Sequence, residues 1–319
     1  MSHRFQVLLT DRAWPDWEIE RRILNEADAD LIEAPDGREE TLVRLARDCD
    51  AIGTCWARVT ANVIAAAPRC RAIARFGIGL DNIDLEAAAA RRIVVTRVPD
   101  YCVEEVADHT LALLLAINRN IAFFHLRTKR GEYNLKAGPP MRRLSGRTLG
   151  LIGFGRIGQA VYRKARGLGM QVIAWTRSGG DSGTGCPMRT FHEVLETSDY
   201  LSLHLPLTDE TRGLLGDEAL QKVRPGAALI NTSRGPLIDH AALERVLSEG
   251  RLAAAALDVF DPEPPDLSHP LFRHERVIVT PHAAFVSEES LIELRTRAAR
   301  QLADVLTGRT PENIVSPPR

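Results

Sequence analysis

A glycine-rich turn in the middle of the chain constrains the fold more than any other feature. The stretch LIGFGRIG (151–158) places Gly153, Gly155 and Gly158 directly after an apolar, strand-like run and at the start of a helical pattern. In this setting the first glycine permits a tight turn, the second lets the backbone approach a pyrophosphate, and the third lets helix and strand pack closely. The helix N-terminus then faces the phosphates. The sequence therefore predicts a dinucleotide-binding βαβ unit in mid-chain.

The strand that follows this unit ends without the acidic residue typical of NAD sites. The run QVIAW (171–175) is followed by Thr176, Arg177 and Ser178. A carboxylate here would accept hydrogen bonds from the adenosine ribose and would repel the 2′-phosphate of NADP by up to about 4 kcal/mol. A guanidinium can instead pair with that phosphate. We therefore predict a preference for NADP over NAD; in the alternative interpretation Arg177 points to water and both cofactors are accepted.

Short strand-like runs alternate with helical patterns, which predicts parallel α/β architecture. The 319 residues are enough for two domains, each with its own core. A helical pattern from about residue 103 to about residue 130 would span about 40 Å, and we interpret it as the connector into a second domain. The polar, Gly- and Pro-containing link at 137–148 predicts a loop or arm. The runs that predict strands are FQVLLT, AIGTC, AIARFG and IVVTRV in the first series, and TLGLIG, QVIAWT, YLSLHL, AALIN, AAAALDV and VIVTPH in the second.

The charge balance and the cysteines set limits on partners and location. With 41 basic and 42 acidic residues the formal net charge is −1, so the bulk basicity typical of nucleic-acid or anionic-membrane binding is absent. The five cysteines form no C-x-x-C pair, and we expect reduced thiols. The sequence contains no apolar run long enough for a signal peptide or a membrane span. We expect a soluble cytoplasmic protein with no metal site and no nucleic-acid or membrane partner.

Five further motifs follow one another in an order that resembles one known family. They are RFGIGLDNIDLEAA (75–88), VPDYCVEEVADHTLALLL (98–115), NTSRGPLID (231–239), ALDVFDPEPP (256–265) and VTPHAA (279–284). Together with the glycine turn, they resemble the D-isomer-specific 2-hydroxyacid dehydrogenase family over nearly the whole chain. The amino-acid sequences of these motifs are most similar to those of the C-terminal-binding-protein and glyoxylate-hydroxypyruvate reductase-like branches.

The resemblance implies two Rossmann-like α/β domains. Residues 1–98 and 286–319 would form a discontinuous, flavodoxin-like substrate domain. Residues 99–285 would form an inserted NAD(P)-binding Rossmann domain, with the active site in the cleft. Because the family is usually dimeric through the cofactor domain, we expect a homodimer with its arm at 120–145.

Three side chains would carry out the reaction that the resemblance implies, the reversible reduction of a small 2-oxo acid to the D-2-hydroxy acid. His282 follows the strand VIVT and Pro281, at a carboxyl end where open α/β sheets bind ligands. An imidazole is a suitable proton donor near neutral pH. Glu263, in the turn DPEPP, matches the family's carboxylate partner, which favours the imidazolium. Arg234, in NTSRG, would hold the substrate carboxylate and carbonyl oxygen in a bidentate fork.

The remaining contacts follow from the resemblance alone. Asp258 would orient the nicotinamide carboxamide, and Asn231 would lie beside the cofactor. His204 would line the adenosine side, although a structural role for this histidine stays open. The backbone turn expected to bind the substrate carboxylate with Arg234 comprises Gly77, Ile78 and Gly79. The residues expected to contact the cofactor are Gly153, Phe154, Gly155, Arg156, Ile157, Gly158, Thr176, Arg177, Ser178, His204, Pro206, Thr211, Thr232, Ser233, Asp258 and His282.

A second hypothesis comes from the same resemblance: a cofactor-gated protein-binding scaffold like the C-terminal-binding-protein corepressors. The arginine, glutamate and histidine do not separate the two hypotheses. The absence of long disordered extensions favours the enzyme. A formate-dehydrogenase-like role is disfavoured, because that branch carries glutamine where Glu263 stands.

The substrate is less constrained than the reaction. The phosphoglycerate dehydrogenase pattern places an arginine about where Thr54 stands, which disfavours a phosphorylated substrate. Trp56, in the same loop, either lines the pocket and favours a bulkier side chain, or belongs to the core or a dimer contact. Glyoxylate, hydroxypyruvate, pyruvate and phenylpyruvate are the candidates, without a ranking.

Overall fold

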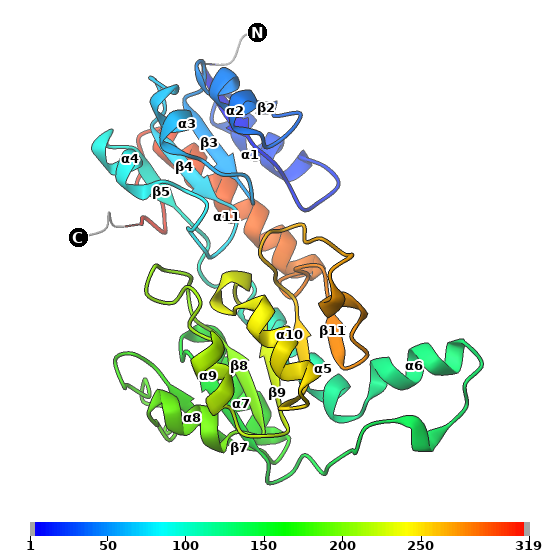
Figure 1. Ribbon diagram of the computed structural model, residues 1–319. Helices are drawn as coiled ribbons and strands as arrows, with labels where there is room; N and C mark the ends of the chain where they lie inside the picture. Colours follow the sequence, from blue (N-terminus) through cyan, green and yellow to red (C-terminus); the bar gives the residue numbers. More distant parts are fainter. Residues whose placement is uncertain (1–3, 316–319) are drawn as a thin grey trace. The chain divides into compact units, whose positions relative to one another are not determined.

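The computed structural model describes residues 4–315, and these form two compact units. Unit 1 consists of residues 4–101 and 287–315, and unit 2 consists of residues 102–286 (Figure 1). The predicted domain boundaries, after residues 98 and 285, lie within three residues of these changes of unit. Unit 2 is thus inserted into unit 1 in the chain, and each unit has a parallel sheet of its own.

The sheet of unit 1 has five parallel strands in the order β2-β1-β3-β4-β5. This is the flavodoxin-like order with its switch point between β1 and β3. Strand β2 was not predicted from the sequence, because its alternation of buried and exposed residues is short and interrupted by charged residues. The strands are β1 (Phe5–Leu9), β2 (Ala29–Glu33), β3 (Ala51–Thr54), β4 (Ala72–Arg75) and β5 (Val94–Thr96).

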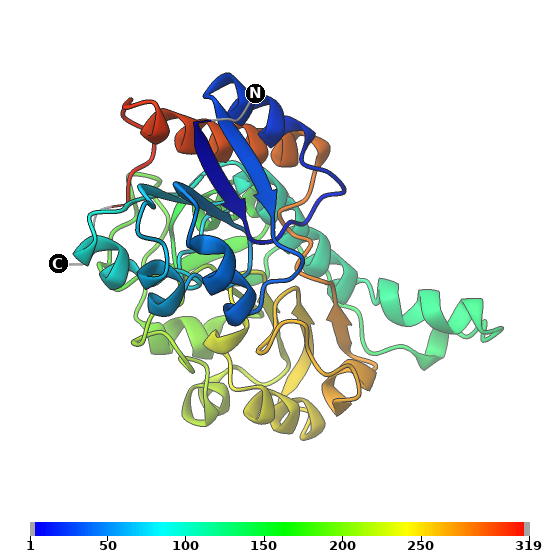
Figure 2. The same cartoon turned by 90° about the horizontal axis from the view of Figure 1, so that it is seen from above.

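One helix from the far end of the chain completes unit 1. Helix α11 (Glu288–Leu306) packs on α1 and on the central strands of this sheet (Figure 1, Figure 2). The guanidinium of Arg71 donates to the carbonyls of Val305 and Leu306, which satisfies acceptors at the end of α11. The other helices of the unit are α1 (Glu18–Glu26), α2 (Glu39–Ala46), α3 (Ala61–Ala65) and α4 (Leu85–Ala90).

The sheet of unit 2 has six parallel strands in the order β11-β10-β9-β8-β6-β7. A single parallel bridge from Ala174 to Met188 adds the remnant of one more strand beside β7, which yields the Rossmann order 3-2-1-4-5-6 with β11 as a seventh position beside β10. The predicted α/β class with two Rossmann-like domains is therefore confirmed. The strands are β6 (Thr148–Ile152), β7 (Gln171–Trp175), β8 (Tyr200–Leu203), β9 (Ala227–Asn231), β10 (Leu252–Leu257) and β11 (Val277–Val279).

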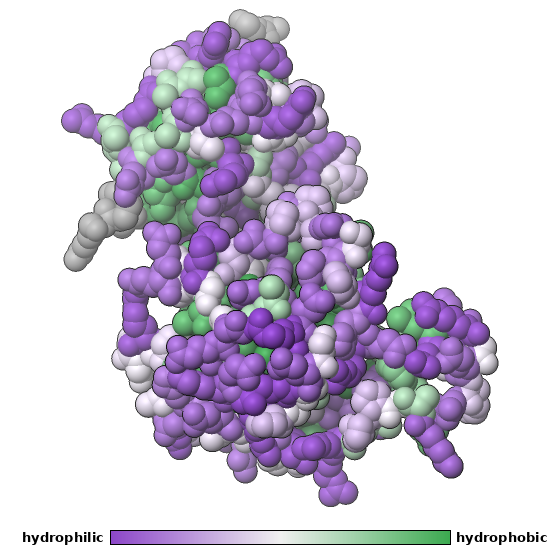
Figure 3. Space-filling view, viewed as in Figure 1, coloured by the Kyte–Doolittle hydropathy of each residue, from purple (hydrophilic) through white to green (hydrophobic). Residues whose placement is uncertain are grey.

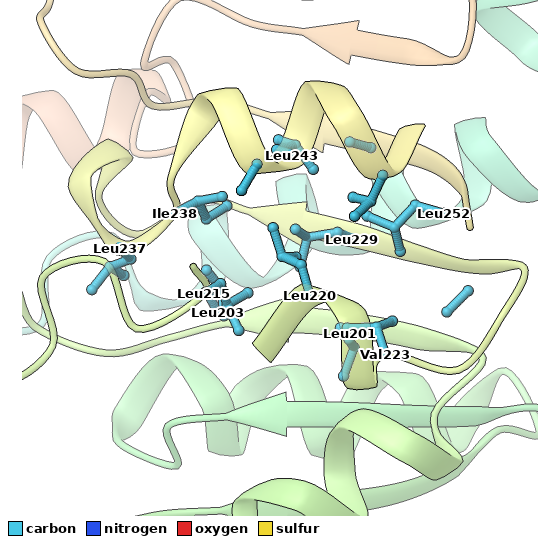
Figure 4. Packing of buried hydrophobic residues seen from close by; sticks show 14 of the residues in the cluster. Leu201, Leu203, Leu215, Leu220, Val223, Leu229, Leu237, Ile238, Leu243 and Leu252 are labelled. Atoms are coloured by element: carbon cyan, nitrogen blue, oxygen red, sulfur yellow. The ribbon is translucent and has the colours of Figure 1, made fainter. Parts of the chain in front are cut away.

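Helices cover both faces of this second sheet, and alternate strand residues supply the two cores. Leu229 and Leu257 face a leucine-rich cluster, part of which Figure 4 shows, whereas Ile230 and Ala256 face the other side. The helices over the leucine-rich cluster are α8 (Phe191–Thr197), α9 (Asp217–Lys222) and α10 (His240–Ser248). Those on the opposite face are α5 (Val103–Asn118) and α7 (Arg156–Gly167).

The long helix predicted for about 103–130 is wrong, because the chain breaks it into two. Helix α5 ends at Asn118, Asn120 adopts a left-handed backbone (φ 52°), and α6 (Ile121–Lys129) begins afterwards. Asparagine tolerates this conformation better than most residues. Helix α5 belongs to unit 2 rather than connecting the units.

Helix α6 and the segment after it project from unit 2 as an arm (Figure 1). No residue of α6 is buried, and the short helix Leu135–Ala137 that follows is exposed as well. Apolar side chains gather on the arm (Figure 3); the most exposed are those of Ile121, Leu126, Tyr133 and Leu135.

Across residues 4–315, no helix is both long and apolar enough to span a bilayer.

Candidate active site

Three loops at the carboxyl edge of the unit 2 sheet carry the predicted catalytic side chains. Arg234 follows β9, Glu263 follows β10 and His282 follows β11. Because these strands are parallel and adjacent, their carboxyl ends lie along one edge of the sheet. A cation, a carboxylate and an imidazole from separate parts of the sequence therefore lie along this edge.

Glu263 and His282 form a hydrogen-bonded pair. Nδ1 of His282 lies 2.7 Å from Oε2 of Glu263, while the backbone N–H of Phe260 donates to Oε1 at 2.8 Å. A carboxylate only accepts, so Nδ1 carries a proton and the imidazole is oriented with Nε2 away from the glutamate. The His282 side chain keeps 24% of its surface exposed, so solvent or substrate can reach it.

The ionised form of Glu263 is favoured by its neighbours. Burial, the largest single influence, raises the pKa of this carboxyl, whereas the hydrogen bond from His282 and the charge of that imidazole lower it. The Phe260 N–H and the charge of Arg234 act in the same direction, and the net pKa of Glu263 lies below its usual value. The pair is thus suited to stabilise an imidazolium.

The fully buried carboxylate of Asp258 braces the turn that carries His282. It accepts hydrogen bonds from the Thr280 hydroxyl at 2.5 Å and from the amides of Ala283 and Ala284 at 2.9 Å each. His282 has a left-handed backbone (φ 52°), which non-glycine residues adopt rarely. The predicted role of Asp258, a contact to the nicotinamide carboxamide, did not include this bracing of the turn.

A buried asparagine shapes the loop of Arg234. The side chain of Asn231 accepts from the Ser233 amide at 3.0 Å and donates to the Arg234 carbonyl at 2.8 Å. Gly235 then packs against the backbone of Phe260, so closely that a Cβ there would lie 2.1 Å from that carbonyl. The loop of Arg234 and the loop of Glu263 are therefore held against each other.

The glycine turn between β6 and α7 fits a dinucleotide. Gly153 has φ 100°, and a Cβ on it would lie 2.5 Å from the carbonyl oxygen of His204. A Cβ on Gly158 would lie 2.6 Å from the carbonyl oxygen of Gly153, whereas Gly155 faces open space. No side chain caps the first N–H groups of α7, which begins at Arg156. These groups are available to phosphate oxygens, and the open side of Gly155 lets them approach.

On the adenosine side, Arg177 pairs with a carboxylate that the sequence did not reveal. Its guanidinium forms an ion pair with Glu210, although the two side chains are 84% and 70% exposed. Arg177 and Arg189 both line an open hollow at the end of β7, next to Thr176 and Ser178. Exposed ion pairs contribute about 0–1 kcal/mol, so a stronger anion can replace Glu210.

Three other residues predicted to contact the cofactor, His204, Pro206 and Thr211, lie in the segment after β8. Nε2 of His204 lies 2.9 Å from the hydroxyl of the buried Ser202, and burial lowers the pKa of His204 to about 4. This imidazole is therefore uncharged at neutral pH and does not act as a cation. The Thr211 hydroxyl donates to the carbonyl of Pro206 at 2.8 Å and so stabilises the loop between them.

Comparison with known proteins identifies the family. Residues 111–284 match the profile described as "D-isomer specific 2-hydroxyacid dehydrogenase, NAD binding domain". The chain belongs to the D-isomer specific 2-hydroxyacid dehydrogenases. A glyoxylate reductase of Aeropyrum pernix is 39% identical over 287 residues, which cover 87% of this chain and 86% of the relative.

Two solved structures share the whole architecture. A D-lactate dehydrogenase from Aquifex aeolicus, complexed with NAD and lactic acid, is 27% identical with a TM-score of 0.87 over 98% of this chain and 100% of that one. An acyclic imino acid reductase in complex with NADPH and D-Arg is also 27% identical, with a TM-score of 0.86 and the same coverage. The protein is thus an oxidoreductase of the D-2-hydroxyacid dehydrogenase class that uses a nicotinamide cofactor.

Unit 1 of this dehydrogenase carries the predicted substrate turn. Gly77 has φ 155°, and the guanidinium of Arg75 lies so close that a Cβ on Gly77 would be 2.5 Å from its Nη1. Arg75 is only 7% exposed, and its Nη1 donates to the Phe76 carbonyl. Arg75 was not among the predicted site residues, because an arginine at a strand end carries no signal until its burial is known. This buried cation adds positive potential beside the turn Gly77, Ile78 and Gly79.

The loop that contains Trp56 is held by a carboxylate from the loop that follows β1 of the dehydrogenase. Asp11 accepts hydrogen bonds from the backbone amides of Cys55, Trp56 and Ala57, at 2.9, 2.6 and 3.1 Å. Trp56 itself remains 41% exposed, whereas Thr54 is buried and donates to the Ala57 carbonyl. The tryptophan therefore lies outside the core of unit 1.

Proposed function

We propose that this dehydrogenase reduces a small 2-oxo acid to the D-2-hydroxy acid, with His282 as proton donor, Glu263 as its partner and Arg234 as the substrate-binding cation. The observation that carries the proposal is the 2.7 Å pair of His282 and Glu263 at the carboxyl edge, one strand away from the loop of Arg234. The reduced nicotinamide, when bound, supplies a hydride for the carbonyl carbon.

The side chains of this chain supply the proton and the charges. The imidazolium of His282 would transfer its Nε2 proton to the carbonyl oxygen as that oxygen becomes an alkoxide. Glu263 stabilises the imidazolium and keeps the ring in one orientation. Arg234 would bind the substrate carboxylate and polarise the carbonyl. In the oxidative direction the neutral imidazole takes the hydroxyl proton back.

Initial rates with the four candidate oxo acids, measured with NADPH and NADH, test this proposal. His282→Ala is expected to lower kcat by about 10²- to 10⁴-fold and to leave cofactor binding intact. His192→Ala, at an exposed position of α8, is the matched control and should retain full activity. Unchanged rates in His282→Ala would remove this histidine from the mechanism. Cofactor binding without turnover of any of the four acids would instead favour the scaffold hypothesis.

The cofactor preference that we propose is NADP. The three residues directly after β7 include no carboxylate, and the exposed Arg177 lies beside Thr176 and Ser178 at the hollow where a 2′-phosphate would bind. Arg177→Ala is expected to lower kcat/KM for NADPH by about 10- to 100-fold and to leave that for NADH unchanged. Arg163→Ala, an exposed arginine on α7, serves as the control. A higher kcat/KM for NADH than for NADPH in the native enzyme would overturn the preference.

For the substrate, we propose an unphosphorylated 2-oxo acid. Thr54 is buried and bonded to its own loop, so it offers no cation for a phosphate. The name of the Aeropyrum relative makes glyoxylate the first acid to assay. If Trp56 lines the pocket, Trp56→Ala changes the ratio of kcat/KM between phenylpyruvate and glyoxylate; if it does not, the ratio stays the same.

We also propose a homodimer formed through unit 2. The arm exposes Leu126, Tyr133 and Leu135, whose side chains find no core in their own chain. Light scattering after gel filtration should give twice the mass of one chain. In the double variant Tyr133→Ser and Leu135→Ser, the measured mass should fall toward that of a single chain. A monomeric native protein would contradict this proposal.

A further inference from the structure

Two consecutive side chains of α5 contact two different loops at the carboxyl edge of the unit 2 sheet. Nε2 of His109 lies 3.0 Å from the hydroxyl of Thr280, two residues before His282. The hydroxyl of Thr110 lies 2.9 Å from that of Thr232, two residues before Arg234. These contacts span 171 and 122 residues of sequence. The motif VADHT, which the proposed mechanism leaves without a role, thus reaches both loops.

The hydrogen-bond directions in the His109 contact are determined by Asp258. The Thr280 hydroxyl has one proton, and it donates this proton to Oδ1 of Asp258 at 2.5 Å. Its oxygen must therefore accept from His109, so Nε2 of His109 carries a proton. The same Nε2 lies 3.5 Å from Oδ1 of Asp258. His109 thereby stabilises the hydrogen-bond network around Asp258, which also includes the Ala283 and Ala284 amides.

The second contact has a determined direction as well. The hydroxyl of Thr110 donates to the Val106 carbonyl at 2.8 Å, so its oxygen accepts from the hydroxyl of Thr232. Thr110 is fully buried and Thr232 is 8% exposed. Burial makes an unpaired hydroxyl unfavourable, so this bond defines where the start of the Arg234 loop lies.

We propose that His109 and Thr110 are positioning residues, which hold the His282 turn and the Arg234 loop at a set spacing on one rigid helix. Helix α5 is a suitable support because it is 16 residues long and packs along α7 and under β9 and β10. The left-handed backbone of His282 is retained only where surrounding contacts determine it, and the His109 contact supplies one of these. The inference rests on the roles proposed above for His282 and Arg234.

The first test compares His109→Leu with His109→Gln. Leucine removes the donor, whereas the glutamine amide can still donate to Thr280. We expect His109→Leu to lower kcat by about 10- to 100-fold with an unchanged KM for NADPH, and His109→Gln to restore most of it. Asp108→Asn, the neighbouring residue with an exposed ion pair to Lys164, is the control. Equal activity of His109→Leu and native enzyme would overturn the inference, provided that His282→Ala is inactive.

The second test uses the protein without cofactor or substrate. Hydrogen exchange at the Ala283 and Ala284 amides, both bonded to Asp258, should be several-fold faster in His109→Leu than in the native protein. Exchange within α7 should not change if the variant is folded. Protection of the two amides equal to the native protein's would overturn the inference, even where His282→Ala has lost activity.

The Thr110 contact predicts a different kinetic effect. Thr110→Val leaves the buried Thr232 hydroxyl proton without its acceptor, whereas Thr110→Ser keeps that acceptor. We expect Thr110→Val to raise KM for the oxo acid by about 10-fold, because Arg234 is displaced, and Thr110→Ser to stay near the native value. A valine variant with a native KM would remove Thr110 from the proposal.

Discussion

At the scale of single residues, the electrostatic environment determines which predicted groups carry charge. Glu263 and His204 are both partly removed from solvent, yet their pKa values are lowered for different reasons. For the glutamate, hydrogen bonds and charges from His282, Phe260 and Arg234 together outweigh burial, whereas burial alone keeps the histidine neutral. Residue type alone does not separate a charged site from a neutral one.

The lowered pKa of Glu263 predicts a pH-dependent contribution to stability. A carboxyl with a depressed folded-state pKa stabilises the fold above its unfolded-state value of about 4.3, and this contribution is lost as the pH falls through the folded-state value. The difference in free energy of unfolding between native protein and Glu263→Gln should therefore be largest near neutral pH and shrink below about pH 4. Urea denaturation at several pH values measures it. A difference that does not vary with pH would contradict the expectation.

His204 predicts a loss of stability in a higher pH window. Its folded-state pKa of about 4 lies below the ordinary value of 6.5, so the unfolded chain binds a proton first as the pH falls. Stability from this group is complete above about pH 6.5 and declines toward about pH 4. His204→Gln, which can keep a hydrogen bond to Ser202, should flatten this part of the stability profile. An unaltered slope between these pH values would show that His204 does not titrate there.

At the scale of elements, the loops after β9 and β10 act as one structure. Gly235 lies against the Phe260 backbone, and the Phe260 amide in turn holds Glu263. Space rather than backbone conformation requires glycine here, because only a missing Cβ permits this approach. A substitution that moves the Arg234 loop should therefore also displace Glu263.

Gly235→Ala tests this coupling. The added Cβ forces the two loops apart, and we expect kcat to fall by about 10²-fold with a smaller effect on NADPH binding. Gly167→Ala in α7 is the matched control, because a Cβ there meets no atom within 4 Å. Helix propensity predicts that this control is stabilised by about 0.5–1 kcal/mol. Native kinetics in Gly235→Ala would show that the loops move independently.

Local patterns in the sequence predict elements well where one residue type or spacing decides them. The glycine turn and the strand ends before Arg234 and His282 are of this kind, since β9 ends at Asn231 and β11 at Val279. The break of the long helix at Asn120 and the charged edge strand β2 were missed, because tertiary packing decides both. Arg75, Glu210 and His109 lack a local signal, since burial or distant partners define their roles.

At the scale of the whole molecule, a buried ion pair holds the two separate chain segments of unit 1 together. Arg295 of α11 donates to Glu20 of α1 at 2.8 Å, and Glu20 is fully buried. The same guanidinium donates to Asp16 at 2.6 Å. The two ends of the chain are thus joined through charges that cannot be left alone in a core.

Arg295→Met should destabilise unit 1 by about 3–5 kcal/mol, because it leaves the Glu20 carboxylate buried without a partner. Calorimetry should show a lower melting transition for unit 1, while the transition of unit 2 stays in place. Arg309→Met, which removes a largely exposed ion pair with Asp304, should change stability by less than about 1 kcal/mol. Equal effects of the two substitutions would contradict the assignment.

Because the chain returns to unit 1 only at α11, the two units complete their folding in a set order during synthesis. Translation at about 5–20 residues per second leaves roughly 10–40 seconds between the synthesis of residue 101 and that of residue 287. Unit 2 can fold as soon as its last strand emerges, whereas unit 1, begun first, must wait for α11 to cover Ile23, Ala27 and the carboxylate of Glu20. During synthesis, unit 2 therefore completes its fold while unit 1 still exposes the apolar face that α11 later covers. That exposed face is where we expect a chaperone to bind.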